Sequence, residues 1–232
     1  MGRWEPNARG RLQQAAFELF FEHGFEQATV TEIASRAGLT ERTFFRHFAD
    51  KPEVFFAGQA VLQERVLTAI AAAPDVAAPL DVVAAAFEAA SAMFHDNREF
   101  ARRRQAVIAA NAELRERELT KLAMLAGAIA EALRARGVRE PAASLAAEAG
   151  IAVFKIAFGR WTSDAAGLPQ PSLTQLIRES LSALRAVTAA SDDVAARLCR
   201  PAVPRIAATD SAATAACRLE VGSPLKRGET GA

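Results

Sequence analysis

The sequence predicts an all-α fold of about nine helices. Apolar residues recur at the three- and four-residue spacing of helices, and no segment alternates apolar and polar residues with a period of two. Glycine and proline breaks divide the chain into segments of helix length. The predicted helices cover residues 7–23, 29–37, 41–47, 53–72, 80–94, 98–110, 112–136, 142–164 and 172–189. Because 51% of the 232 residues are hydrophobic, these helices can bury a sizeable core.

The first two helices carry their own start and stop signals. Leu12, Ala16, Leu19 and Phe20 form one apolar face, and a glycine at position 24 ends the first helix. The segment 29–32 reads Thr-Val-Thr-Glu, a capping box in which the threonine and glutamate side chains satisfy backbone N–H groups at a helix start. A second, short helix is therefore expected there.

A glycine turn joins the second helix to the third. Gly38 permits the left-handed backbone that a sharp turn between helices needs, and Thr40 is a favourable N-cap for the next helix. Phe44 and Phe48, four residues apart, mark the inner face of that third helix. Two short helices joined in this way predict a helix-turn-helix.

Alanine-rich helical patterns occupy most of the remaining chain. Breaks fall at Pro74 and Pro79, at 95–97, at 137–141 and at 167–171, and periodicity fades after Ala190. We therefore expect three parts: residues 1–51, residues 52–190 and a flexible tail at 191–232. No apolar run approaches the roughly 20 residues of a membrane helix, and the start lacks a secretory signal. A cytoplasmic protein without membrane contact is expected.

The distribution of charged residues indicates a locally positive surface and not a basic protein. The net charge is +1, so overall basicity does not indicate a nucleic-acid partner. Residues 1–51 contain seven Lys and Arg against seven Asp and Glu, whereas residues 36–51 contain four against two. Positive charge thus gathers around the third helix.

Motifs of catalysis are missing from the sequence. There is no H-E-x-x-H, no glycine-rich phosphate loop and no G-x-S-x-G, and the histidines number three. Cys199 and Cys217 lie outside any C-x-x-C spacing, which indicates neither a disulfide framework nor a zinc site. We expect no enzyme activity, no metal and no cofactor.

The stretch TVTEIASRAGLTERTFFRHF at residues 29–48, followed by Lys51, closely resembles the DNA-binding signature of the tetracycline-repressor (TetR) family. The resemblance implies a three-helix DNA-binding domain over 1–51 and a ligand-binding and dimerisation domain over 52–190. It also implies a homodimeric transcription regulator, most often a repressor, that binds palindromic operator DNA and is released by a hydrophobic or amphipathic small molecule. The segment 102–133 resembles actinobacterial members related to the mycofactocin-system regulator.

DNA contacts can be expected residue by residue. Because the N-terminal end of a recognition helix enters the major groove, we expect base contacts from Arg42, Thr43 and Arg46, and the resemblance adds Thr31. The resemblance implies backbone contacts from Thr29, Phe45, His47 and Lys51, and the N-terminal Arg9 and Arg11 can add to this electrostatic contact. Phe45 departs from the family, which usually has tyrosine there, so a phosphate hydrogen bond is lost.

The resemblance also implies a pocket and a dimer interface. Expected pocket residues are Phe87, Met93, Phe94, Phe100, Ile108, Met124, Phe154, Phe158 and Trp161, with Asp96, Asn97 or Arg104 as an unranked polar anchor. Expected interface residues are Val153, Ile156, Leu176, Ile177, Leu181 and Leu184. The run Arg102–Arg104 is interpreted as a solvated helix face. A constitutive regulator or interaction protein with a vestigial pocket is the alternative function.

Overall fold

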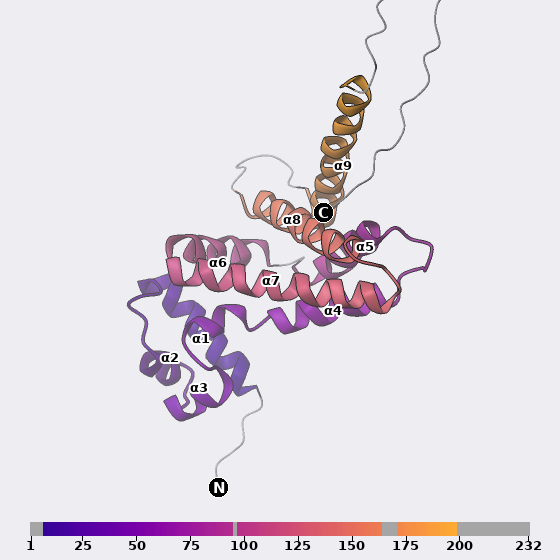
Figure 1. Cartoon of the computed structure of the whole chain (residues 1–232). Coiled ribbons are helices and arrows are strands. Elements are labelled where there is room, and N and C mark those ends of the chain that lie inside the picture. Colours follow the sequence, from indigo (N-terminus) through magenta and orange to yellow (C-terminus); the bar gives the residue numbers. More distant parts are fainter. Residues whose placement is uncertain (1–6, 95–96, 164–170, 199–232) are drawn as a thin grey trace, which may run out of the picture. The chain divides into compact units, whose positions relative to one another are not determined.

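The computed structural model describes residues 7–94, 97–163 and 171–198, and within them the fold is all-helical, as predicted (Figure 1). The α-helices are α1 (Ala8–His23), α2 (Val30–Arg36), α3 (Glu41–His47), α4 (Gln59–Ala71), α5 (Pro79–Ala90), α6 (Arg98–Ala110), α7 (Ala112–Ala135), α8 (Ala142–Thr162) and α9 (Leu173–Leu198). Two 3-10 turns, η1 (Pro52–Phe56) and η2 (Ser91–Phe94), follow α3 and α5. The described residues up to Asp192 form one compact unit.

The start of α2 is the capping box that the sequence predicts. The backbone N–H of Thr29 donates to the Glu32 carboxylate over 2.9 Å, and its hydroxyl donates to the same oxygen over 2.8 Å. In return the Glu32 backbone N–H donates to the Thr29 hydroxyl oxygen over 3.2 Å. These bonds fix where α2 begins.

The turn between α2 and α3 depends on glycine at position 38. Its φ is +65°, a left-handed conformation, and a Cβ built there would lie 2.8 Å from the guanidinium of Arg11. That guanidinium donates to the carbonyl of Ala37, which ties α1 to the end of α2. Thr40 then caps α3, because its hydroxyl accepts from the Thr43 backbone N–H over 3.2 Å. Figure 1 shows α2 and α3 beside α1.

The single helix predicted over 53–72 is wrong, because η1 and α4 are separate elements. Val54, Phe55 and Phe56 are all buried, at 0%, 3% and 5% exposure. Three successive side chains span too wide an angle to share one face of an α-helix, whereas the packing of η1 buries all three. Pro52 begins the turn and Gly58 precedes α4. The segment 80–94 is likewise divided, into α5 and η2.

Two hydrophobic cores are present. The first combines α1, α2, α3 and η1 with Ile108 of α6 and Leu114 of α7, both fully buried. The second lies among α4, α5, α7, α8 and the first part of α9. Because residues beyond 100 complete the first core, the N-terminal helices pack directly onto the helical domain.

The C-terminal part differs from expectation in length. Helix α9 continues to Leu198, beyond the expected end at 189. Residues 199–232, with Cys199 and Cys217 and most of the predicted tail, lie outside the described residues. Among the described helices, α8 is long and apolar enough to cross a membrane by length and composition, with 44% of the apolar window buried. Its packing against α5 and α7 buries part of that apolar surface.

Two helical glycines provide a test of the packing between α5 and α8. A Cβ at Gly150 of α8 would lie 2.2 Å from Cγ1 of Val83 on α5, whereas a Cβ at Gly127 of α7 would meet nothing within 4 Å. Gly150→Ala is expected to lower the free energy of unfolding by about 1–3 kcal/mol through overpacking. Gly127→Ala is expected to raise it by about 0.5–1 kcal/mol through helix propensity. Urea unfolding at one fixed protein concentration measures both, and equal effects would contradict the close α5–α8 approach.

The capping box also makes a pH-dependent prediction. Hydrogen bonds from the backbone and hydroxyl of Thr29 hold the pKa of Glu32 below its ordinary value of 4.5. Because the folded-state pKa is the lower one, this interaction stabilises the fold above about pH 4.5 and is lost as the pH falls through the folded pKa. Thr29→Val removes the hydroxyl bond and is expected to raise the Glu32 pKa part of the way back, measured by NMR titration. Thr68→Val on α4 is the control, and an unchanged Glu32 pKa in Thr29→Val would count against the cap.

Candidate DNA-binding surface and buried cavity

Helix α3 separates a buried face from an exposed one. Phe44 is 0% exposed and packs in the N-terminal core, with Phe48 at 2% just after the helix. Arg42, Phe45 and Arg46 lie on the outer side, and Phe45 is 54% exposed. Since Arg42 and Arg46 are one turn apart, their guanidinium groups share that outer face.

The cationic side chains near α3 differ in whether they pair with an acidic side chain. Arg36 on α2 is paired with Glu22 at 2.9 Å and with Glu18 at 3.8 Å. By contrast, Arg42 and Arg46 have no hydrogen-bond or ion-pair partner among the described residues. The outer face of α3 therefore carries uncompensated positive charge although the N-terminal segment as a whole is balanced.

Other expected DNA contacts are engaged within the chain. The hydroxyl of Thr31 donates to Glu41 at the start of α3, and the hydroxyl of Thr43 lies 3.1 Å from that of Thr40. His47 is half-buried, and its Nε2 is a buried atom without a hydrogen-bond partner. Arg9 donates to the carbonyl of His47 over 3.2 Å, at the C-terminal end of α3.

The ammonium of Lys51 faces the protein. It donates to the carbonyl oxygens of Phe25 at 2.8 Å and Ala28 at 3.0 Å, and it lies 4.3 Å from the centre of the Phe25 ring. This lysine thus clamps the segment between α1 and α2 to the start of η1. A direct phosphate contact would require the ammonium to leave those carbonyls.

A cavity of about 470 Å³ lies among α1, η1, α4, η2, α6, α7 and α8. Its size falls within the range of roughly 300–1,000 Å³ typical of small-molecule sites. Seven phenylalanines line it, namely Phe17, Phe55, Phe56, Phe94, Phe100, Phe154 and Phe158. The ionisable residues in its lining are Arg104, Glu118, Lys121 and Lys155. The cavity lining is therefore rich in phenylalanine and contains three cationic residues and one anionic residue.

Some of the expected pocket residues line this cavity. These are Met93, Phe94, Phe100, Phe154 and Phe158, together with the candidate anchors Asn97 and Arg104. Asp96 lies outside the described residues.

Four other expected pocket residues do not line it. Phe87 stacks behind Phe154 at 4.7 Å between ring centres, and Trp161 packs behind Phe94 and Phe158. Ile108 belongs to the N-terminal core, and Met124 is 65% exposed on α7. Phe87, Ile108 and Trp161 were expected in the pocket because a large apolar side chain at helical spacing predicts burial. That pattern does not distinguish a position in a cavity wall from a position in a core.

Four cavity residues, Gln13 among them, come from α1 or η1 and were not expected. Phe17 of α1 and Phe55 and Phe56 of η1 lie before or just after the boundary drawn at residue 51. Phe17 contacts Phe55 and Phe100, with ring centres 5.2 Å and 4.7 Å apart. The run of Val54, Phe55 and Phe56 was the available signal, because three successive large apolar side chains do not fit one face of a single helix.

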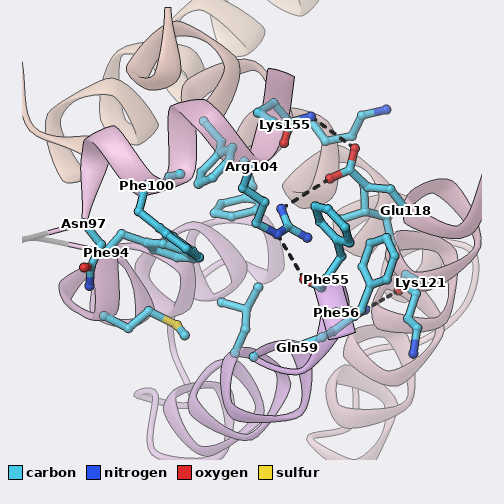
Figure 2. A pocket seen from close by; sticks show the side chains of 18 of the residues that line it. Phe55, Phe56, Gln59, Phe94, Asn97, Phe100, Arg104, Glu118, Lys121 and Lys155 are labelled. Atoms are coloured by element: carbon cyan, nitrogen blue, oxygen red, sulfur yellow. Dashed lines mark hydrogen bonds and ion pairs between the residues drawn. The ribbon is translucent and has the colours of Figure 1, made fainter. Parts of the chain in front are cut away.

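Arg104 is the most deeply placed charge in the cavity. Its Nε donates to the carbonyl of Phe55 over 3.0 Å, and its Nη1 lies 3.8 Å from the Glu118 carboxylate, too far for a hydrogen bond (Figure 2). Burial lowers the pKa of Arg104 below the ordinary arginine value, and Glu118 partly opposes that shift. The expectation that Arg102–Arg104 is a solvated face fails for this residue: about 100° of rotation per residue separates neighbouring side chains.

An ion-pair network fastens η1 to α7. Arg117 pairs with both oxygens of Asp50, at 2.8 Å and 2.7 Å, while Lys121 donates to Glu53 over 2.9 Å. The Asp50 hydrogen bond raises the pKa of Arg117 above its ordinary value. Asp50 also accepts from the backbone N–H of Glu53 over 2.8 Å, so one carboxylate both caps η1 and holds α7.

The residues expected at a dimer interface divide into two groups. Val153, Leu176, Ile177 and Leu181 are at most 9% exposed and already pack in the second core of their own chain. Leu184 is half-buried, whereas Ile156 is 59% exposed. Leu145 on α8 and Val187 on α9 are further exposed apolar side chains, at 65% and 70%.

Comparison with known sequences identifies the N-terminal segment. Residues 12–57 match the family model described as bacterial regulatory proteins, tetR family. TcmR, a helix-turn-helix transcriptional regulator of Streptomyces glaucescens, is 40% identical over 81 residues, covering 35% of this chain and 36% of TcmR. MftR of Mycobacterium tuberculosis, named for mycofactocin biosynthesis, is 39% identical over 51 residues, covering 22% of this chain and 26% of MftR. The chain thus spans about a third of TcmR and about a quarter of MftR, and MftR is not matched better than TcmR.

The fold extends the likeness past this segment. FadR of Bacillus subtilis, solved in complex with stearoyl-CoA, superposes with a TM-score of 0.51 at 21% identity, over 75% of this chain and 95% of FadR. Other curated relatives are described as transcriptional repressors, and one as a transcriptional activator. Residues 12–57 are thus similar to the tetR family of bacterial regulatory proteins, and the likeness to FadR shows that most of this chain has the same helical fold.

Proposed function

We propose that the chain is a ligand-responsive transcriptional repressor that binds a palindromic DNA operator as a homodimer. The observation that carries the DNA-binding part is the outer face of α3, where Arg42 and Arg46 are exposed and have no partner among the described residues. A helix presented in this way fits the major groove, and its arginines can bond guanine edges in pairs. Thr43 and Thr31 would add base contacts.

Backbone contacts would position α3 without reading sequence. Thr29 and His47 lie at the two ends of the helix-turn-helix, and Phe45 would contact sugar or a thymine methyl through its ring. We assign Lys51 to the same group through its charge, while its hydrogen bonds shape the loop before α2. Arg9 would contribute from the start of α1.

The cavity supports a ligand response. Its lining includes Phe17 of α1 and both phenylalanines of η1, so a bound molecule would touch the N-terminal unit itself. FadR of Bacillus subtilis binds stearoyl-CoA within the same fold. Release of DNA requires that the ligand bind one arrangement of the N-terminal unit more tightly than the other. We propose a hydrophobic or amphipathic inducer.

Dimerisation would use α8 and α9. Leu145, Ile156 and Val187 are exposed apolar side chains on these helices, and burying them against a second copy is favourable. A two-fold pair of α3 helices would read two half-sites about 34–36 Å apart. We propose a cytoplasmic protein without catalytic activity, and a constitutive regulator with a vestigial pocket is the alternative if no ligand is bound.

Selection of bound sequences from random duplex DNA tests this function. The wild type is expected to enrich a palindrome, and the double change Arg42→Ala, Thr43→Ala is expected to abolish that enrichment, since each lost bidentate contact is worth about 1–3 kcal/mol of discrimination. Arg36→Ala is the matched control, because Arg36 is paired with Glu22 on α2 and should leave the sequence unchanged. Failure of the wild type to enrich any sequence at low salt would refute the repressor assignment.

Phe45 gives a second test on the same helix. Phe45→Tyr adds a hydroxyl at a 54% exposed position and is expected to tighten DNA binding by about two- to ten-fold through a phosphate hydrogen bond. Because phosphates carry no sequence information, the gain should be similar for operator and random DNA. Fluorescence anisotropy at fixed salt measures it, with Phe21→Tyr, packed beside Phe17 and Phe100, as the control. A gain confined to the operator would argue for base contact instead.

A further inference from the structure

We propose that the cavity takes a planar aromatic carboxylic acid, whose carboxylate pairs with the guanidinium of Arg104 and whose rings lie among the phenylalanines. This inference rests on the proposed ligand-binding role of the cavity. It adds the chemical class of the ligand and the residue that selects it.

The hydrogen bonds of Arg104 are incomplete. Its Nε is used by the Phe55 carbonyl, but among the described residues the terminal nitrogens have no acceptor within hydrogen-bond distance. Only 20% of the side chain is accessible, and it forms part of the cavity lining. Buried N–H groups of a charged side chain are costly to leave unpaired, and a carboxylate matches a guanidinium with two parallel hydrogen bonds.

The carboxylate already present does not fill this role. Glu118 stands 3.8 Å from Arg104 and accepts a hydrogen bond from Gln105 over 3.2 Å. Lys121 and Lys155 also line the cavity, but Lys121 is paired with Glu53 at 2.9 Å and Lys155 is exposed, so Arg104 and Lys155 together outnumber the single carboxylate of Glu118. The charge of the lining is therefore complemented by an anionic ligand and opposed to a cationic one.

The side chains that line the cavity favour a ligand with aromatic rings. Figure 2 shows Phe55 and Phe56 beside the guanidinium of Arg104, with Phe94 and Phe100 farther along the same cavity lining. The Arg104 guanidinium lies 5.4 Å from the centre of the Phe56 ring, so the anchor stands directly beside an aromatic wall. Flat rings can stack on such faces or meet them edge-on, which adds to simple burial of apolar area. An acid of about three fused rings fits within 470 Å³.

The adjacent arginines provide an internal comparison. Arg103 is exposed and stacks over Phe21 at 4.2 Å, outside the cavity lining. Arg103 and Arg104 have the same charge and lie on the same helix, but only Arg104 reaches the cavity. A ligand that recognises position 104 should therefore be indifferent to position 103.

Isothermal titration calorimetry of the full chain without DNA tests the proposal. The probes are anthracene-2-carboxylic acid, the neutral anthracene-2-carboxamide and the aliphatic tetradecanoic acid. The wild type is expected to bind the aromatic acid at least about ten-fold more tightly than the amide, and more tightly than tetradecanoic acid. Equal affinity for acid and amide would overturn the Arg104 pairing, and tighter binding of tetradecanoic acid would overturn the aromatic body. No binding of any probe would overturn both.

Variants then assign the selectivity. Arg104→Gln is expected to reduce the acid-to-amide ratio to about one, Arg104→Lys to keep part of it, and Arg103→Gln to leave it unchanged. The ratio is compared within each variant, so a general loss of folding, checked by circular dichroism, lowers both affinities and is not mistaken for lost pairing. A ratio that survives Arg104→Gln would refute the assignment. Because no DNA is present, a failure here is distinct from a failure to select an operator.

Discussion

The rest of the structure depends on the burial of three successive side chains in the turn η1. Val54 and Phe55 complete the core beneath α1, and Phe55 and Phe56 form part of the cavity wall. One five-residue turn is thus shared between the helix-turn-helix and the cavity. Asp50 and Glu53 hold it to α7 through Arg117 and Lys121.

Because η1 contacts both the cavity and the N-terminal core, a change in the cavity can reach α3 through a small number of contacts. A ligand that moves the ring of Phe55 also moves Phe17 and Phe20, two residues of α1 whose rings contact it. Close-packed interiors move between discrete arrangements and do not deform smoothly, so a small shift at η1 can become a different placement of the helix-turn-helix. A carboxylate bound at the terminal nitrogens of Arg104 would share that guanidinium with the Phe55 carbonyl, which links the ligand directly to η1.

Elements with local chemical signals could be predicted from sequence. The capping box at Thr29, the left-handed Gly38 and the N-cap Thr40 each act within four residues, and α1 to α3 begin and end close to where these signals place them. The break between η1 and α4 and the placement of Phe17 in the cavity depend on packing against segments distant in the chain. For the same reason Arg102, Arg103 and Arg104 could not be told apart: one pairs with Glu99, one covers Phe21 and one lines the cavity.

The pairing of Arg36 with Glu22 and the inward clamp of Lys51 have a kinetic consequence. Arg36 is neutralised and Lys51 must leave its carbonyl partners to reach a phosphate, so binding to random sequence should depend less steeply on salt than the number of Lys and Arg residues suggests. A regulator of this kind gains little electrostatic acceleration toward DNA and spends little time trapped on the competing sites of a genome. Its residence on DNA would then be governed by what α3 reads in the groove.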